Sequence, residues 1–185
     1  MKKFLFFLPL LILVVVGGFS VKQLYRVQSG ETVDKLPSVL INRPVPEFEL
    51  AAIQGRDRGW GTKDLLGQVT IVNIFGSWCV ACQVEHPFLV RIQEQNLVPI
   101  YGLDWREKNP EAGPKWLARY GDPYTLVGDD PKSVAAIAFG VTGAPESFIV
   151  DKKGVIRYKQ IGPITPQNWQ QTLWPLIQKL KEEPA

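Results

Sequence analysis

The chain has 185 residues, of which 21 are basic and 18 acidic, for a formal net charge of +3. Four basic residues lie among the first 26 positions, before any acidic one, so the remaining 17 basic and 18 acidic residues leave the body near neutral, at −1. A near-neutral body excludes the electrostatic footprint of a nucleic-acid-binding protein. The length corresponds to about one domain, and two cysteines are too few to staple a secreted fold.

The N-terminal end carries a membrane signal. Residues 4–21 contain no charged side chain and follow two lysines. Because about 20 apolar residues span the hydrocarbon layer, residues 1–21 are predicted to be an uncleaved anchor, with cleavage at the small-x-small pattern Gly18-x-Ser20 as the alternative. Either way the lysines stay in the cytoplasm and the body is exported, which in a Gram-negative cell means the periplasmic side of the inner membrane. Residues 22–46 are predicted to be a linker, and residues 47–185 the folded domain.

Strand and helix patterns alternate along the body. Apolar and β-branched runs predict strands at 48–53, 69–75, 97–105 and 124–129, and a hairpin around a Lys-Lys-Gly turn at 147–161. Helical patterns cover a short turn at 62–67, the stretch from 79 to about 96, then 114–121, 131–140, and a terminal helix at 166–183 that is broken or kinked near Pro175. This order predicts an α/β fold with a central mixed β-sheet and helices on both faces.

Both cysteines lie in one short stretch, GSWCVACQVEHPF, at residues 76–88. Cys79 follows the predicted buried strand and opens a helix, where unpaired backbone N–H groups and the helix dipole stabilise a thiolate. Cys82 lies one turn deeper and can resolve a mixed disulfide. The pattern therefore predicts that the more exposed Cys79 attacks and the buried Cys82 releases the product, with a redox-active disulfide between them and no other cofactor.

A Cys-x-x-Cys could also belong to a zinc site, a copper site or a peroxidase. A structural zinc site needs four ligands, whereas the sequence has no second cysteine pair and a single histidine, His86. Two thiolates can hold Cu(I), although copper carriers of related fold use Cys-x-x-x-Cys and a distant histidine. A peroxidase of the peroxiredoxin type would carry a proline and a threonine before the reactive cysteine, and VNIFGSWC has neither.

The chain resembles the thioredoxin superfamily. The resemblance rests on Trp78-Cys79-x-x-Cys82, on Pro87 five residues after the second cysteine, and on GVTGAPESFIVDKKG at 140–154. Over about residues 40–180 it is most similar to the DsbE/CcmG-type thiol:disulfide interchange proteins of cytochrome c biogenesis. This resemblance implies a thioredoxin-like central mixed sheet flanked by helices. The chain departs from the usual pattern at Val80-Ala81, where family members commonly have a proline after the first cysteine, so the strength of the reductant is open.

The resemblance also implies roles for the segment around Pro145. The Ala144–Pro145 bond is expected to be cis and to lie beside the cysteines, since X–Pro reaches cis at modest cost. The N–H and C=O of Ala144 would then pair with an extended substrate segment as an added strand does. Trp78 is expected to shield the disulfide and to pack against the substrate.

The proton acceptor for Cys82 cannot lie at the position where thioredoxins have it. Thioredoxins have a buried aspartate six residues before the first cysteine, but Asn73 occupies that position here. Glu85 lies three residues after Cys82 and shares its helix face, so it is the predicted proton acceptor, with a pKa raised by partial burial. The family also has a glutamate after the cis-proline, and Glu146 is accordingly expected to act as an electrostatic modulator at the rim.

Two further residues are candidates for the site. His86 is expected to be a partly exposed helix residue, with direct chemistry as the alternative. Asp104 ends a predicted strand, near the sheet edge where ligands approach in such folds.

The expected partners follow from the resemblance. The substrate would be the Cys-x-x-Cys-His disulfide of apocytochrome c, reduced before haem attachment, with electrons from a membrane thiol-disulfide donor. Another periplasmic disulfide target, a Cu(I) metallochaperone and a non-catalytic binding module remain the alternatives.

Overall fold

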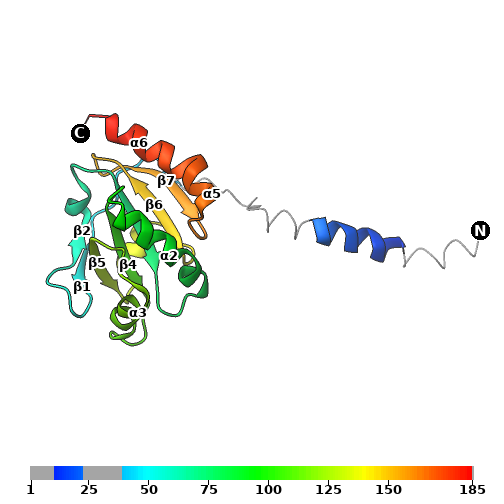
Figure 1. Cartoon of the computed structure of the whole chain (residues 1–185), viewed down its shortest axis with the longest axis horizontal. Coiled ribbons are helices and arrows are strands. Elements are labelled where there is room, and N and C mark those ends of the chain that lie inside the picture. The colour runs from blue at the N-terminus through cyan, green and yellow to red at the C-terminus, as the bar shows by residue number, and fades with distance from the viewer. Residues whose placement is uncertain (1–10, 23–38, 185) are drawn as a thin grey trace, which may run out of the picture. The chain divides into compact units, whose positions relative to one another are not determined.

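The computed structural model of the chain describes residues 11–22 and 39–184 (Figure 1). The elements of the folded body are β1 (Glu49–Ala52), β2 (Trp60–Gly61), η1 (Thr62–Leu65), β3 (Thr70–Phe75), α2 (Val80–Glu94), β4 (Ile100–Trp105), α3 (Ala112–Tyr120), β5 (Leu126–Asp130), α4 (Val134–Ala138), β6 (Glu146–Val150), β7 (Ile156–Ile161), α5 (Pro166–Asn168), η2 (Trp169–Leu173) and α6 (Trp174–Glu182).

The strands form a mixed sheet, as the sequence predicts. Their order is β2-β1-β5-β4-β3-β6-β7. The three central strands β5, β4 and β3 are parallel, while β1, β2, β6 and β7 pair antiparallel at the two sides. All six residues of β3 are buried, which is the expected state of a central strand covered on both faces. This strand leads directly to the two cysteines.

Each face of the sheet carries its own hydrophobic core, because successive side chains of a strand point to opposite faces. Ile71 and Phe75 of β3 pack in one core, with side chains of α2, α3, η2 and α6 and with both cysteines. Val72 and Ile74 pack in the other core, with α4 and with Trp60 of β2. The predicted helices on both faces are thus confirmed, and α2 holds the cysteines against one face.

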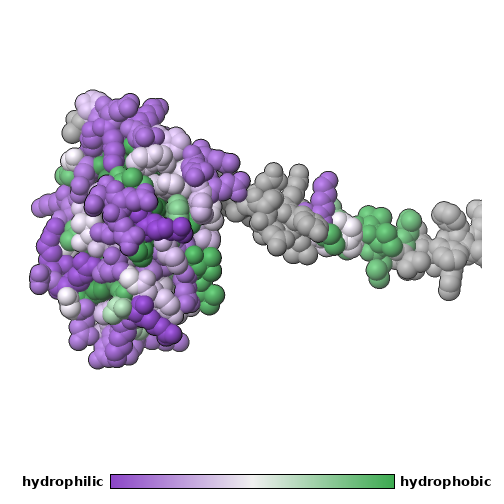
Figure 2. Space-filling model, viewed as in Figure 1, coloured by the Kyte–Doolittle hydropathy of each residue, from purple (hydrophilic) through white to green (hydrophobic). Residues whose placement is uncertain are grey.

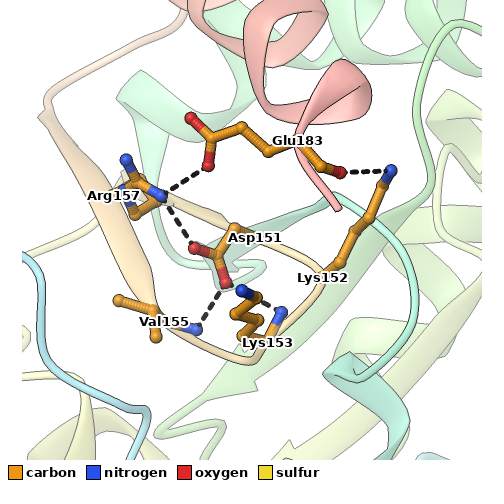
Figure 3. Close-up of polar contacts among 6 residues, drawn as sticks. All are labelled: Asp151, Lys152, Lys153, Val155, Arg157 and Glu183. Carbon is orange, nitrogen blue, oxygen red and sulfur yellow. Dashed lines mark hydrogen bonds and ion pairs between the residues drawn. The ribbon is translucent and has the colours of Figure 1, made fainter. Parts of the chain in front are cut away.

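The β6–β7 turn is built around the carboxylate of Asp151 (Figure 3). Its oxygens accept the backbone N–H groups of Lys153 and Val155 at 2.9 and 3.0 Å, and pair with Arg157 at 2.9 Å. Arg157 also pairs with Glu183, just beyond α6, at 3.0 Å. The predicted Lys-Lys-Gly turn is confirmed, and its aspartate ties the hairpin to the C-terminal helix.

The packed body begins earlier than the predicted boundary at residue 47. The backbone N–H groups of Asn42 and Val45 donate to carbonyls of Ile156 and Gly154 at 2.7 and 2.9 Å, and Pro44 forms a bridge with Val155. Val45 is buried in the core. The last residues of the predicted linker therefore belong to the domain, because they line the edge of the β6–β7 hairpin.

Two helices depart from their predicted bounds. The helix expected at 131–140 is only α4, because Ser133 adopts a left-handed conformation and breaks it. The carboxylate of Asp130 caps α4 instead, accepting N–H groups of Val134 and Ala136 at 2.5 and 2.8 Å. Helix α3 begins two residues before Pro114, which suits a residue without a backbone N–H in the first turn.

The terminal helix is interrupted as predicted. The π-helical turn η2 precedes α6, whose first turn contains Pro175. A proline lacks the N–H that would bond four residues back, so the preceding turn widens.

The N-terminal unit, residues 1–37, is described only in part. Residues 11–22 form a helix whose large apolar side chains are exposed (Figure 2). Within residues 11–22 and 39–184, no helix reaches the length and apolar content needed to cross a bilayer. Residues 1–10 of the predicted anchor and 23–38 of the predicted linker lie outside the described residues.

Candidate active site

The cysteine pair lies where β3 ends and α2 begins. Cys79 is the N-cap of α2 and forms a disulfide with Cys82, with the two Sγ atoms 2.03 Å apart. The backbone N–H of Cys82 donates to Cys79 Sγ over 3.1 Å. Cys79 is 5% exposed and Cys82 1% exposed, so Cys79 is the more accessible of the two, although both are buried. One N–H group of the first helical turn, that of Cys82, therefore binds the sulfur that the sequence predicts to attack.

The loop before Cys79 is held from the end of β4. Trp78 is half exposed, packs against Trp105 with ring centroids 5.9 Å apart, and donates its indole N–H to the Trp105 carbonyl at 3.0 Å. Ser77 donates through both its backbone N–H and its hydroxyl to the carboxylate of Glu107. Sequence reasoning missed Ser77, Trp105 and Glu107, because nothing local links residues 30 positions apart.

The segment around Pro145 adjoins the hydrophobic core that contains the cysteines. The Ala144–Pro145 bond is cis, as the resemblance implied. Ala144 packs against the core cluster that contains Cys79 and Cys82. Within the described part of the chain, no hydrogen bond uses the backbone N–H or C=O of Ala144. An extended chain could therefore pair there.

Glu85 is buried, with 2% of its surface exposed. Its Oε1 accepts the side-chain amide of Asn73 at 2.9 Å, and its Oε2 accepts the backbone N–H of Ile164 at 2.7 Å. Burial raises the pKa of Glu85 to about 7, against the smaller lowering effects of the Ile164 and Asn73 hydrogen bonds. A carboxyl group with that pKa, one turn beyond Cys82 on the same helix, can exchange a proton near neutral pH.

Asn73 belongs to a wholly buried polar network. Tyr124 donates its hydroxyl to Asn73 Oδ1 at 2.6 Å, and the Asn73 amide also donates to Ser147 Oγ at 2.9 Å. The Glu85 carboxylate, which can only accept, turns the NH₂ end of the amide towards itself, and the Tyr124 hydroxyl bonds the oxygen end. Tyr124 and Ser147 were missed by sequence reasoning, although a polar Asn73 inside the apolar run VTIVNIF was a signal that buried partners must exist.

The expectation that Glu146 lies at the rim is wrong. Its side chain is 1% exposed and pairs with Lys159 at 3.0 Å. It also accepts the backbone N–H of Thr142 at 3.2 Å, and Lys159 donates to the carbonyl of Gly140 at 2.8 Å. A charge can be buried here because it is both paired and hydrogen-bonded. Glu146 thus clamps the segment that carries the cis-proline.

His86 is buried, contrary to expectation, and Asp104 is buried as well. The His86 ring lies against Trp116 with centroids 4.2 Å apart and donates from Nε2 to the Gly121 carbonyl at 2.8 Å, and burial lowers the pKa of His86. Asp104 lies near the end of β4, as predicted, but is only 1% exposed. These two residues connect α2 and β4 to α3.

A disulfide at a helix N-terminus, together with a cis-proline directly before β6, defines the class: the protein is a thiol:disulfide oxidoreductase of thioredoxin-like fold. The AhpC/TSA family model matches residues 41–159. The chain is 39% identical to the thiol:disulfide interchange protein DsbE of Pseudomonas aeruginosa over 184 residues, which is 100% of this chain and 98% of that protein. It is 43% identical to the DsbE of Allochromatium vinosum over 77% of this chain and 78% of that protein. The chain therefore belongs to the DsbE thiol:disulfide interchange proteins of the AhpC/TSA family.

Solved structures agree on the fold. A secreted thiol-disulfide isomerase from Corynebacterium glutamicum matches with a TM-score of 0.61 at 20% identity, over 72% of this chain and 85% of its own.

Proposed function

We propose that the protein is anchored in the inner membrane by residues 1–21 and works in the periplasm. There it would reduce the Cys-x-x-Cys disulfide of apocytochrome c before haem attachment, with electrons from a membrane thiol-disulfide donor. The family resemblance supports this target, and the uncharged run of residues 4–21 supports the anchor. Tethering raises the effective concentration of the domain near other membrane components.

The exchange proceeds in two steps. The Cys79 thiolate attacks one sulfur of the substrate disulfide, which forms a mixed disulfide and releases one substrate thiolate. Cys82 then loses its proton to Glu85 and attacks the Cys79 sulfur, which forms the Cys79–Cys82 disulfide and releases the second substrate thiolate. Two electrons pass from the cysteine pair to the substrate.

The observation that carries this proposal is the buried Glu85 carboxyl one turn beyond Cys82. The second step needs a base close to a buried thiol, and Glu85 is 2% exposed with a pKa of about 7. Glu146 is assigned a positioning role in place of the electrostatic one, because it holds the cis-proline segment through Thr142 and Lys159.

A mixed-disulfide trap tests the target. In the full chain, Cys82→Ser should leave the substrate attached to Cys79, and mass spectrometry of the captured species should find apocytochrome c linked through its Cys-x-x-Cys. Cys79→Ser is the matched control, since it removes the attacking sulfur and should capture nothing. Capture of other periplasmic proteins without apocytochrome c would overturn the proposed substrate while leaving the chemistry intact.

The location is tested separately. The full chain should remain in the membrane pellet after alkaline carbonate extraction, and a variant lacking residues 1–21 should be soluble. A full chain released by carbonate, or processed near Gly18, would contradict the anchor.

A further inference from the structure

The entry to α2 depends on the residues that follow β4. Both donors of Ser77 bind the Glu107 carboxylate, with Oγ and Oε2 2.9 Å apart, and Trp78 is bound to the Trp105 carbonyl. Cys79 closes the same loop by donating its N–H to the Gly76 carbonyl at 3.0 Å. The position of the Cys79 sulfur is therefore set partly by Glu107, a residue outside the Cys-x-x-Cys stretch.

Glu107 itself faces a second carboxyl group. After burial, Glu107 contributes most to raising the pKa of Asp104, through charge repulsion and a side-chain interaction, so the two carboxyl groups are neighbours. Asp104 is 1% exposed, and its Oδ1 has no hydrogen-bond partner among the described residues. The first turn of α3 covers it so closely that a Cβ at Gly113 would come within 1.8 Å of Asp104 Oδ2.

The groups around Asp104 are acidic or uncharged. Asp129 lies opposite it across the β4–β5 register, and β3 contributes the apolar Phe75. Tyr124 adds a buried hydroxyl whose own ionisation Asp104 opposes. Among the described ion pairs, none involves Asp104, and the neighbouring Arg106 places its guanidinium over the Trp105 ring, 5.6 Å from its centroid.

Two neighbouring carboxyl groups, of which Asp104 is fully and Glu107 partly buried, cannot both be ionised at low cost. Burial raises the pKa of Asp104 to about 8, with further contributions from Glu107 and Asp129. A proton held by Asp104 gives the carboxyl group an O–H donor, and a side-chain oxygen of Glu107 is an acceptor for it.

We propose that Asp104 and Glu107 share one proton, and that this carboxyl pair is a positioning device which holds Ser77, and with it the Cys79 end of the disulfide. When the shared proton is lost, repulsion between the two carboxylates moves Glu107 and loosens its bonds to Ser77. The inference rests on the exchange site itself and does not depend on which disulfide the protein reduces.

The oxidised full chain in detergent gives a clean test, because neither cysteine titrates in the disulfide. The Ser77 backbone N–H and the Trp78 indole N–H are followed by proton–nitrogen NMR from about pH 6 to about pH 9.5, a range that brackets the raised pKa of Asp104. We expect both signals to shift together with a midpoint near the Asp104 pKa of about 8. In Asp104→Asn the shift should be lost, because the amide donates to Glu107 at every pH, and both signals should stay at the wild-type low-pH position.

Two matched variants separate this pair from other titrating groups. Glu85→Gln removes the other carboxyl that titrates near neutral pH and should leave the Ser77 shift in place. Asp129→Asn removes a neighbouring charge and should move the midpoint to lower pH without abolishing the shift. If Asp104→Asn does not fold, Glu107→Gln serves in its place and should also abolish the shift.

The proposal is overturned if the Ser77 signal of the wild-type chain does not move, or if it titrates unchanged in the Asp104→Asn or Glu107→Gln chain. Failure of the apocytochrome c trap would leave this test unaffected, so the two proposals fail separately.

Discussion

Replacing Glu85 with glutamine tests the proton acceptor directly. The two chemical steps can be watched in one experiment by mixing the reduced chain with dithiobis(nitrobenzoate). Attack by Cys79 releases the first nitrothiobenzoate, and resolution by Cys82 releases the second. General-base catalysis typically contributes about 10²–10⁴-fold. We therefore expect Glu85→Gln to slow the second release by about 100-fold or more near neutral pH, while the first release keeps its wild-type rate.

The glutamine should not unfold the protein, because the surrounding network can invert. Glu85 accepts two N–H groups, from Asn73 and Ile164, whereas glutamine offers one oxygen and one NH₂ group. If the Asn73 amide turns over, its oxygen accepts from the glutamine, and the hydroxyls of Tyr124 and Ser147 exchange donor for acceptor roles. Every hydrogen bond of the network is then replaced.

The same substitution changes how stability depends on pH. The folded-state pKa of Glu85 is raised from 4.5 to about 7, so the folded state binds this proton more tightly than the unfolded state does. The contribution to stability is full below pH 4.5 and is lost as pH rises to about 7. At about 1.36 kcal/mol per pKa unit this amounts to about 3 kcal/mol. Urea unfolding of the oxidised chain should show this loss for the wild type and not for Glu85→Gln.

A second release within about threefold of the wild-type rate, with an unchanged pH profile, would refute the role of Glu85. In that case the thiol of Cys82 would have to lose its proton to water or to another group, because so small an effect lies far below the range of general-base catalysis.

Two further substitutions probe the residues that hold the site. Lys159→Met leaves Glu146 buried without its partner and should lower the free energy of unfolding by about 3–5 kcal/mol. Lys159→Met combined with Glu146→Leu should recover much of that loss. Both are measured by urea unfolding, and equal losses in the single and double variants would contradict the clamp. Tyr124→Phe removes the hydroxyl that orients Asn73 and should cost about 1–3 kcal/mol. It should also raise the pH midpoint of the second nitrothiobenzoate release, because Asn73 no longer stabilises the ionised Glu85; an unmoved midpoint would contradict that coupling.

The central sheet and the position of the cysteines could be predicted from the sequence because both depend on local patterns. The run VTIVNIF predicts a central strand, and β3 is buried at all six residues. A helix start directly after it places Cys79 at an N-cap. The strand β2 was not predicted, because it has only two residues and no period. Its Trp60 is fixed by distant contacts, including a hydrogen bond to the Gly102 carbonyl at 3.0 Å.

The burial of Glu146 could not be read from its neighbours in the sequence. Its partner Lys159 lies on the next strand, and the two meet because β6 and β7 pair with Phe148 opposite Lys159. His86 was misjudged for a similar reason, since the surface that buries it comes from Trp116 and Gly121. Where a charged side chain finds a distant partner, a local pattern predicts exposure and tertiary packing decides otherwise.

A further experiment asks whether the carboxyl group must stand on α2 or only somewhere in this buried network. Glu85 shares a helix with Cys82, and three residues of helix advance about 4.5 Å along the axis, so their spacing is fixed by α2 alone. Asn73 lies on β3 and hydrogen-bonds Glu85 at 2.9 Å, at the position where thioredoxins carry a buried aspartate. The exchanged pair Asn73→Asp with Glu85→Gln moves the carboxyl group from α2 to β3. The NH₂ group of the glutamine then donates to the carboxylate of the aspartate.

If a buried carboxyl in this network is the only requirement, the exchanged pair should recover part of the second nitrothiobenzoate release that Glu85→Gln loses. The carboxylate introduced on β3 would still accept a hydrogen bond from the Tyr124 hydroxyl and would be as deeply buried as that of Glu85. Asn73→Asp alone is the control, and it should be the less stable protein, since two carboxyl groups then lie in contact. A folded double variant that stays as slow as Glu85→Gln would show that the base must stand on α2, at the spacing that the helix imposes on Cys82.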